Sequence, residues 1–143
     1  MPRVLVALSG GIDSETSAKI LIQNNFEVIA VTMKMCQYNN IGIQKADEIC
    51  KKLNIQHQII DVREEFKNKV INNFIDEYMN GHTPNPCIIC NRYIKFKILF
   101  DKAIEYKCDN IATGHYADIG NDNGRFFIRK AEDKTKDQSY MLW

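Results

Sequence analysis

The chain has 143 residues, of which 45% are hydrophobic and 26% are charged, and its formal net charge is +1. This length suits one domain with a real hydrophobic core, and the composition is close to that of an average soluble globular protein. The near-zero net charge excludes a global electrostatic field as a guide to a nucleic-acid partner.

The sequence shows no pattern typical of a membrane or secreted protein. No apolar stretch approaches the ~20 residues that a membrane helix needs, and residues 1–3 lead directly into an apolar run without a signal-peptide pattern. The five cysteines are an odd number, which argues against a disulfide framework. We therefore expect a cytoplasmic protein without membrane contact, whose cysteines bind metal, carry out redox chemistry or act as nucleophiles.

The first part of the chain predicts two buried parallel strands with a helix between them. Residues 4–8 and 28–33 are apolar, rich in β-branched side chains and bounded by turn residues. Buried parallel strands are apolar throughout and do not alternate with polar residues. Residues 13–24 have helical length and end at two asparagines, which favour a helix stop.

The next segments continue the alternation of helix and strand. Apolar side chains recur at helical spacing over residues 46–53 and again, in steps of four, over residues 66–78. Residues 56–62 between them predict a third strand. Cys50 belongs to the first apolar stripe, so we interpret it as a small core residue and not as a ligand.

The last part begins with an irregular loop, residues 81–91, which contains two prolines and two cysteines; a long loop of this kind is usually functional. A helix is expected at about residues 93–106 and a strand at 110–113, followed by a hairpin with strands 116–119 and 125–129. The whole pattern predicts an α/β fold, with an open parallel sheet, helices on both faces and a C-terminal β-hairpin.

The strongest chemical signal is the turn Ser-Gly-Gly-Ile-Asp-Ser at residues 9–14, between the first strand and the first helix. Two glycines allow a tight turn and a close approach to phosphate, and the exposed N–H groups at a helix start attract anions. Asp13 is either a helix N-cap or a ligand for Mg²⁺ on the phosphates. The turn lacks the Gly-Lys-Ser/Thr of the Walker pattern, and it resembles the signature of PP-loop ATP pyrophosphatases.

Three further motifs narrow the resemblance. Residues 83–91 (Thr-Pro-Asn-Pro-Cys-Ile-Ile-Cys-Asn, with Ile-Lys-Phe behind them at 94–96), 112–116 (Ala-Thr-Gly-His-Tyr) and 136–140 (Lys-Asp-Gln-Ser-Tyr) are similar to motifs of bacterial and organellar tRNA-specific 2-thiouridylases. The resemblance covers the whole chain. It implies a PP-loop ATP-binding catalytic domain over residues 1–143 that stops before the central and C-terminal domains of that family.

The resemblance also implies roles for individual residues. ATP would contact Ala7, Leu8, Ser9, Gly10, Gly11, Ile12, Asp13, Ser14, Met33 and Gly114. The tRNA and its target base would contact Asn85, Pro86, Cys87, His115, Lys136, Asp137 and Gln138. Cys90 would be the catalytic nucleophile, with Cys87 beside it. From the residues alone two alternatives stay open, because Met33 could be a core residue and His115 could cap a turn.

The cysteines also depart from the family pattern. Many members have an aspartate in place of Cys87, and their second, persulfide-carrying cysteine belongs to the part that follows this chain. Cys87 and Cys90 have a spacing used for zinc or iron–sulfur ligands, and Cys36 is a candidate third ligand or an inert surface thiol. Cys108 lies on the opposite edge of the predicted sheet and is excluded as a metal ligand.

The implied activity is ATP-dependent 2-thiolation of the wobble uridine of tRNA, with ATP, Mg²⁺ and an optional iron–sulfur cluster as cofactors. Sulfur would come from a cysteine desulfurase through carriers, or as sulfide. Two alternatives are another adenylating PP-loop enzyme and a non-catalytic module that binds nucleotide or metal. A helix starting near Arg92 is further expected to lower the pKa of the Cys90 thiol through its N-terminal end.

Overall fold

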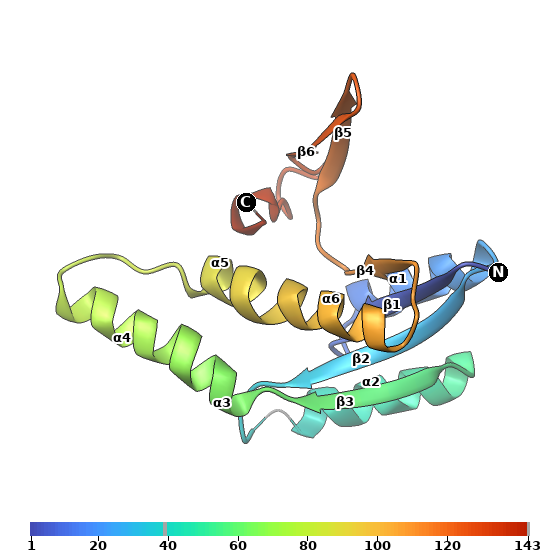
Figure 1. Cartoon of the computed structure of the whole chain (residues 1–143), viewed down its shortest axis with the longest axis horizontal. Coiled ribbons are helices and arrows are strands. Elements are labelled where there is room, and N and C mark those ends of the chain that lie inside the picture. Colours follow the sequence, from blue (N-terminus) through green and yellow to red (C-terminus); the bar gives the residue numbers. More distant parts are fainter. Residues whose placement is uncertain (39, 143) are drawn as a thin grey trace.

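The computed structural model describes residues 1–38 and 40–142. Its centre is a four-stranded parallel sheet in the order β3-β2-β1-β4 (Figure 1). The strands are β1 (Arg3–Ala7), β2 (Glu27–Lys34), β3 (Gln56–Asp61) and β4 (Asn110–Ala112). β1 lies between β2 and β4, so the turn that follows β1 is flanked by the ends of both neighbours. The predicted open parallel sheet is confirmed.

Helices cover both faces of this sheet. On one face, α1 (Ile12–Gln23) and α2 (Asn40–Leu53) pack against Val6 and Leu8 of the β1 region. On the other face, Leu5 packs under a long helix, which consists of α5 (Pro86–Cys90), the π-helical turn η2 (Asn91–Lys95) and α6 (Phe96–Glu105). Neighbouring strand residues thus belong to different cores, which is why the buried positions of β1 and β2 do not alternate between apolar and polar residues.

The helix after β3 is only partly packed. It consists of α3 (Arg63–Phe66), the π-helical turn η1 (Lys67–Ile71) and α4 (Asn72–Met79), and α4 extends away from the sheet. Val70 is buried, whereas the side chains of Phe74 and Tyr78 are 38% and 58% exposed. The predicted amphipathic helix therefore forms, but the outer half of its apolar stripe does not contact a core.

Two boundaries differ by more than one residue from the sequence-based expectations, at the long helix and at the hairpin. The predicted irregular loop ends earlier, because the helix already begins at Pro86 and not near Arg92. The hairpin strands are β5 (Asp118–Asp122) and β6 (Arg125–Arg129), so the first starts two residues later than expected. Asn123 and Gly124 both have positive φ, at 49° and 89°, as a two-residue hairpin turn requires.

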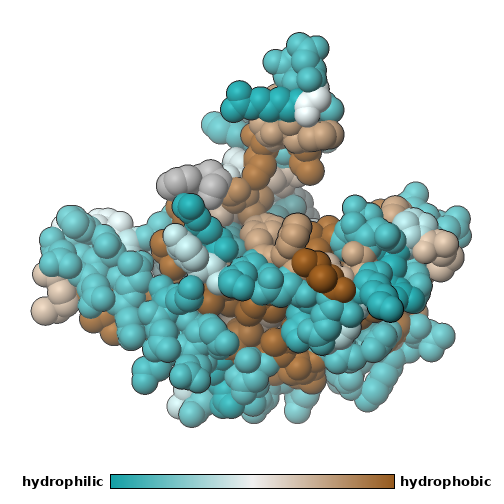
Figure 2. All heavy atoms as spheres, in the orientation of Figure 1, coloured by the Kyte–Doolittle hydropathy of each residue, from teal (hydrophilic) through white to brown (hydrophobic). Residues whose placement is uncertain are grey.

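The hairpin projects from the body, and the chain ends in a short 3-10 turn η3 (Ser139–Met141) beside it (Figure 1). Figure 2 shows hydrophobic side chains gathered below the polar tip of the hairpin. Ile119 and Phe126 on β5 and β6 are 68% and 71% exposed. Among residues 1–38 and 40–142, no helix is long and apolar enough to cross a membrane.

Candidate nucleotide-binding and catalytic site

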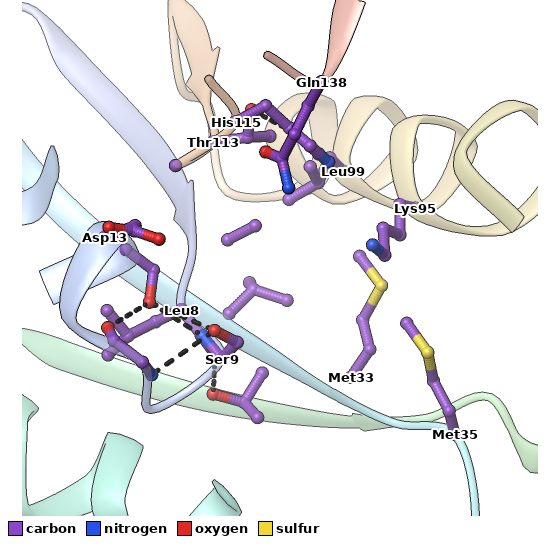
Figure 3. Close-up of a pocket in the computed structure, with 16 residues that line it drawn as sticks. Leu8, Ser9, Asp13, Met33, Met35, Lys95, Leu99, Thr113, His115 and Gln138 are labelled. Carbon is purple, nitrogen blue, oxygen red and sulfur yellow. Dashed lines mark hydrogen bonds between the residues drawn. The ribbon is translucent and has the colours of Figure 1, made fainter. Parts of the chain in front are cut away.

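A cavity of about 390 Å³ opens where β1, β2 and β4 end, between the start of α1 and the long helix (Figure 3). Its size suits a small-molecule ligand, and ligands of open α/β sheets gather beyond the carboxyl ends of the strands. It is lined by these residues that the sequence predicted for ATP or tRNA: Ala7, Leu8, Ser9, Gly11, Asp13, Ser14, Met33, Gly114, His115 and Gln138. Gly10 and Ile12 belong to the same turn but do not line the cavity.

The turn after β1 is held in shape by its two serines. The backbone N–H of Ser9 donates to Ser14 Oγ at 3.2 Å, and Ser14 Oγ donates to the carbonyl oxygen of Gly11 at 2.9 Å. Gly11 is the N-cap residue of α1, and no side chain caps this end of the helix. The free N–H groups of the first helical turn, together with the helix dipole, form an anion-binding end.

Asp13 is not the N-cap that the sequence allowed, because it lies inside the first turn of α1. Its exposed carboxylate lines the cavity and accepts a hydrogen bond from the hydroxyl of Tyr116 at 3.1 Å. The carboxylate is thus available next to the anion-binding turn, the position that a cation ligand would need.

Two glycines near the turn are required for different reasons. Gly10 has φ of +81°, and a Cβ there would lie 2.5 Å from the carbonyl oxygen of Gly42 in α2. Gly114 follows β4, and its Cβ would lie 2.8 Å from the backbone nitrogen of Ser14. Gly10 therefore lets α2 pack against the turn, whereas Gly114 closes the cavity over the start of α1.

The other wall combines apolar side chains with one cation. Val31, Met33, Met35 and Leu99 line this side together with Lys95, a surface suited to a flat apolar base. Thr32, next to Met33 in β2, stabilises this side of the cavity. Its hydroxyl donates to the carbonyl oxygen of Leu8 at 2.7 Å and lies 2.8 Å from His57 Nε2. Neither Lys95 nor Thr32 was predicted as an ATP-site residue.

The segment after the hairpin returns to the cavity. The side chain of Gln138 accepts a hydrogen bond from the N–H of Tyr116 at 3.0 Å, and Gln138 lines the cavity. The carboxylate of Asp137 is occupied internally, since it accepts from the N–H of Ala131 at 2.7 Å and from the hydroxyl of Ser139 at 2.7 Å; these bonds lower its pKa. Lys136 is exposed.

His115 is half-buried and lines the cavity. It also makes one contact of the kind expected from its alternative role as a turn residue. Its Nδ1 lies 2.9 Å from Thr113 Oγ1, and its ring stacks on Phe96 at 6.0 Å between centroids. Burial lowers the pKa of His115, and the charge of Lys95 acts in the same direction. His115 is therefore mostly neutral near pH 7.

The Pro-Cys-Ile-Ile-Cys segment is helical. Asn85 caps it by accepting a hydrogen bond from the N–H of Ile88 at 3.4 Å, and Pro86 occupies the first turn, where a missing N–H costs little. Cys87 is exposed in that turn, whereas Cys90 is buried, with 7% of its surface exposed. None of these residues lines the cavity.

The expected lowering of the Cys90 pKa is wrong. Cys90 lies inside a continuous helix and packs with Met33, Ile94 and Leu99, so no helix start faces its sulfur. Burial raises the pKa of Cys90, which the nearby charge of Lys95 only partly offsets. Cys50, interpreted as a core residue, is indeed buried, and its pKa is raised to about 11.

The three candidate metal ligands do not form a preassembled centre. Within the described residues, no group of three or more His, Cys, Asp or Glu side chains is placed to hold a metal ion. Cys36 is exposed after β2 and lines a separate open cavity with Asp61 and Arg63. We therefore derive no chemical step through an iron–sulfur cluster or zinc ion.

Comparison with known proteins agrees with these observations. A family model described as tRNA methyl transferase HUP domain matches residues 2–143. The tRNA-specific 2-thiouridylase MnmA of Cytophaga hutchinsonii is 47% identical over 99% of this chain, and the chain spans 42% of that protein's length.

Solved structures show the same fold. The U34-tRNA thiolase NcsA from Methanococcus maripaludis, solved with its [4Fe-4S] cluster, is 28% identical with a TM-score of 0.56, over 80% of this chain and 38% of that one. The NH3-dependent NAD synthetase from Campylobacter jejuni, in complex with a nitrate ion, is 23% identical with a TM-score of 0.54, over 78% and 47% of the two chains, and shows the fold alone.

Proposed function

The chain belongs to the family described as tRNA methyl transferase HUP domain, and from this we propose that residues 1–143 are the ATP-binding catalytic domain of a tRNA-uridine 2-sulfurtransferase. The observation that carries the proposal is the cavity that joins the Ser9–Ser14 turn, the apolar wall and Gly114 in one site. Its relative of 47% identity is named as a tRNA-specific 2-thiouridylase. The chain spans less than half of that relative's length.

The chemistry that suits this site begins with activation of the uracil. The C2 carbonyl oxygen attacks the α-phosphorus of ATP, a new O–P bond forms, and the bond to pyrophosphate breaks. The terminal sulfur of the donor's persulfide then attacks C2, a C–S bond forms, and the C2–O bond breaks as AMP leaves with that oxygen. The Cys90 thiolate attacks the donor's inner sulfur, so that the S–S bond breaks, the thiolated uracil is released and a disulfide joins Cys90 to the donor; free sulfide would attack C2 directly. The order follows from the leaving groups, because a carbonyl oxygen leaves readily only after it has been adenylated.

Each part of the site has a task in this sequence. The N–H groups of the Ser9–Ser14 turn stabilise the departing pyrophosphate, and Asp13 would hold a Mg²⁺ ion, which would supply positive charge to neutralise the phosphates. Cys90 is the proposed sulfur-transferring thiol and Cys87 its neighbour. Asn85, Pro86, His115 and the segment 136–138 are the proposed tRNA contacts.

The sulfur source and the cell compartment complete the proposal. Sulfur reaches the site from a cysteine desulfurase and its carriers, or as sulfide, and the reaction takes place in the cytoplasm. Neither depends on a membrane contact.

Pyrophosphate release from ATP, measured with and without uridine-containing tRNA, tests the function. The chain should release pyrophosphate only with tRNA, and Asp13→Ala should abolish this release. Cys90→Ser is the matched variant, since it should still release pyrophosphate but transfer no sulfur. If the wild-type chain binds ATP but releases no pyrophosphate with any uridine-containing tRNA, the domain is a nucleotide-binding module and not a catalytic one.

A further inference from the structure

The wall of the cavity that faces the Ser9–Ser14 turn contains an unexplained cation. Among the described residues that line the cavity, Lys95 is the one lysine or arginine. It comes from η2, on the long helix, and Figure 3 shows its side chain on the side of the pocket away from Ser9 and Asp13. A nucleotide in this cavity would therefore lie between the turn and the Lys95 amino group.

Lys95 also differs from the other lysines of its helix. Lys97 forms an ion pair with Asp101 at 2.7 Å, and Lys102 forms one with Glu105 at 2.6 Å. Within the described part of the chain, the Lys95 ammonium forms no such pair, although its side chain is half-buried. A lysine that lines a cavity without a counter-ion is available to pair with an anionic ligand.

Lys95 lines the cavity and lies close to two other residues of the proposed site. Its charge acts on the half-buried ring of His115, where it adds to the lowering of the pKa by burial, and on the thiol of Cys90, where it partly offsets the raising of the pKa by burial. Arg92 is closer to Cys90 in sequence, yet its guanidinium lies over the ring of Tyr93 at 5.4 Å on the exposed side of the helix. Position on the helix, and not mere proximity in sequence, makes Lys95 the cation of this cavity.

The turn and Lys95 suit different phosphate groups of a bound nucleotide. The N–H groups at the start of α1 and the serine hydroxyls face an anion from one side, and they suit the terminal pyrophosphate. The apolar wall of Met33 and Leu99 suits the adenine. In a nucleotide bound in this way, the α-phosphate would connect these two parts and would lie nearest to the wall from which Lys95 comes.

We propose that Lys95 binds the α-phosphate of the nucleotide and thereby retains the AMP moiety when pyrophosphate leaves; this rests on the proposed ATP-dependent function. This contact would also affect where the adenylate is held relative to Cys90. Cys90 and Lys95 belong to the same uninterrupted helix, so the adenylate stays attached to the element that carries the proposed sulfur-transferring thiol.

Calorimetry with three separate ligands, ATP, AMP and pyrophosphate, tests this division. Lys95→Met should weaken AMP and ATP binding by about tenfold or more, since it removes a charge-assisted hydrogen bond, and should leave pyrophosphate binding within about twofold. Lys95→Arg should restore most of the AMP affinity. Lys97→Met is the control, because it removes the same charge from an exposed position of the same helix.

Each outcome is decisive. Equal losses for pyrophosphate and AMP in Lys95→Met would assign Lys95 to the turn and overturn the proposal, and so would unchanged affinity for all three ligands. Thermal unfolding of each variant separates loss of binding from loss of fold, and Lys95→Arg tests the site if Lys95→Met is unstable. A wild-type chain that binds no ATP would instead contradict the proposed function itself.

Discussion

Replacing Gly114 by alanine would place a methyl group 2.8 Å from the backbone nitrogen of Ser14 and 2.9 Å from the carbonyl carbon of Asp13. Ordinary van der Waals contact begins at 3.4 Å, so the two segments must separate by about 0.6 Å, the difference between 3.4 and 2.8 Å. Both neighbours are backbone atoms, so no side-chain rotation relieves the contact. Overpacking of this kind costs about 1–3 kcal/mol of the free energy of unfolding.

The same displacement moves the first turn of α1, whose N–H groups are proposed to bind phosphate. Misplacement by about 1 Å can cost about 100-fold in rate, and we expect Gly114→Ala to weaken ATP binding about tenfold or more. Calorimetry measures the affinity, and thermal unfolding measures the stability. Equal stability and equal ATP affinity in Gly114→Ala and the wild type would refute the contact.

Gly11→Ala provides a steric comparison within the same turn. The nearest atom to its added Cβ is Ser9 Oγ at 3.4 Å, and its φ of −92° is open to alanine. Its stability should fall by no more than about 1 kcal/mol, because alanine is a poorer N-cap than glycine. A loss as large as that of Gly114→Ala would show that any added methyl group disturbs the turn.

Iodoacetamide should label the exposed Cys87 before the buried Cys90, and mass spectrometry that finds Cys90 labelled first would contradict the structure. Because burial raises the pKa of Cys90, its thiolate fraction is reduced at neutral pH. Its labelling rate should therefore continue to increase as the pH is raised beyond about 8.5, the ordinary pKa of a thiol. Thr32→Val should cost about 1–3 kcal/mol of stability and weaken ATP binding, since the Leu8 carbonyl loses its buried donor; Thr32→Ser should retain both properties in the same melting and calorimetry measurements. Lys136→Ala should weaken tRNA binding and reduce the slope of log affinity against log salt by about one; an unchanged slope in a filter-binding titration would remove this lysine from the tRNA contacts.

The parts of the fold that the sequence predicted are those with a local physical cause. Buried parallel strands are apolar at every position, and β1 and β2 differ from their predicted bounds only by a residue at each end. The turn that follows β1 was recognisable because its glycines and serines lie between a strand and a helix. Long-range packing has no such local signature: Gly10 was expected to approach a phosphate, yet its missing Cβ makes room for Gly42 of α2.

The site residues missed by the sequence analysis follow the same logic. Thr32 directly precedes Met33 at the end of β2, so its neighbour could have indicated it, but its bonds to Leu8 and His57 depend on strand pairing. The sequence indicates Lys95 only as part of the Ile-Lys-Phe motif at residues 94–96. Its role in the cavity depends on the direction in which the helix presents it, and the helix begins earlier than the proline pattern indicated.

The burial of Cys90 constrains any mechanism in which it transfers sulfur. Its thiol belongs to the same buried apolar cluster as Met33 and Leu99, both of which line the cavity. The sulfur can therefore reach the nucleotide site only after a shift of side chains or of the helix. The helix has a weak point at this place, because the π-helical turn η2 begins at Asn91, directly after Cys90. Such turns are rare and frequently mark functional sites. The buried Asn91 side chain donates to the carbonyl oxygen of Met141 at 3.0 Å, so the residue beside the thiol is hydrogen-bonded to η3, which follows the proposed tRNA contacts at residues 136–138.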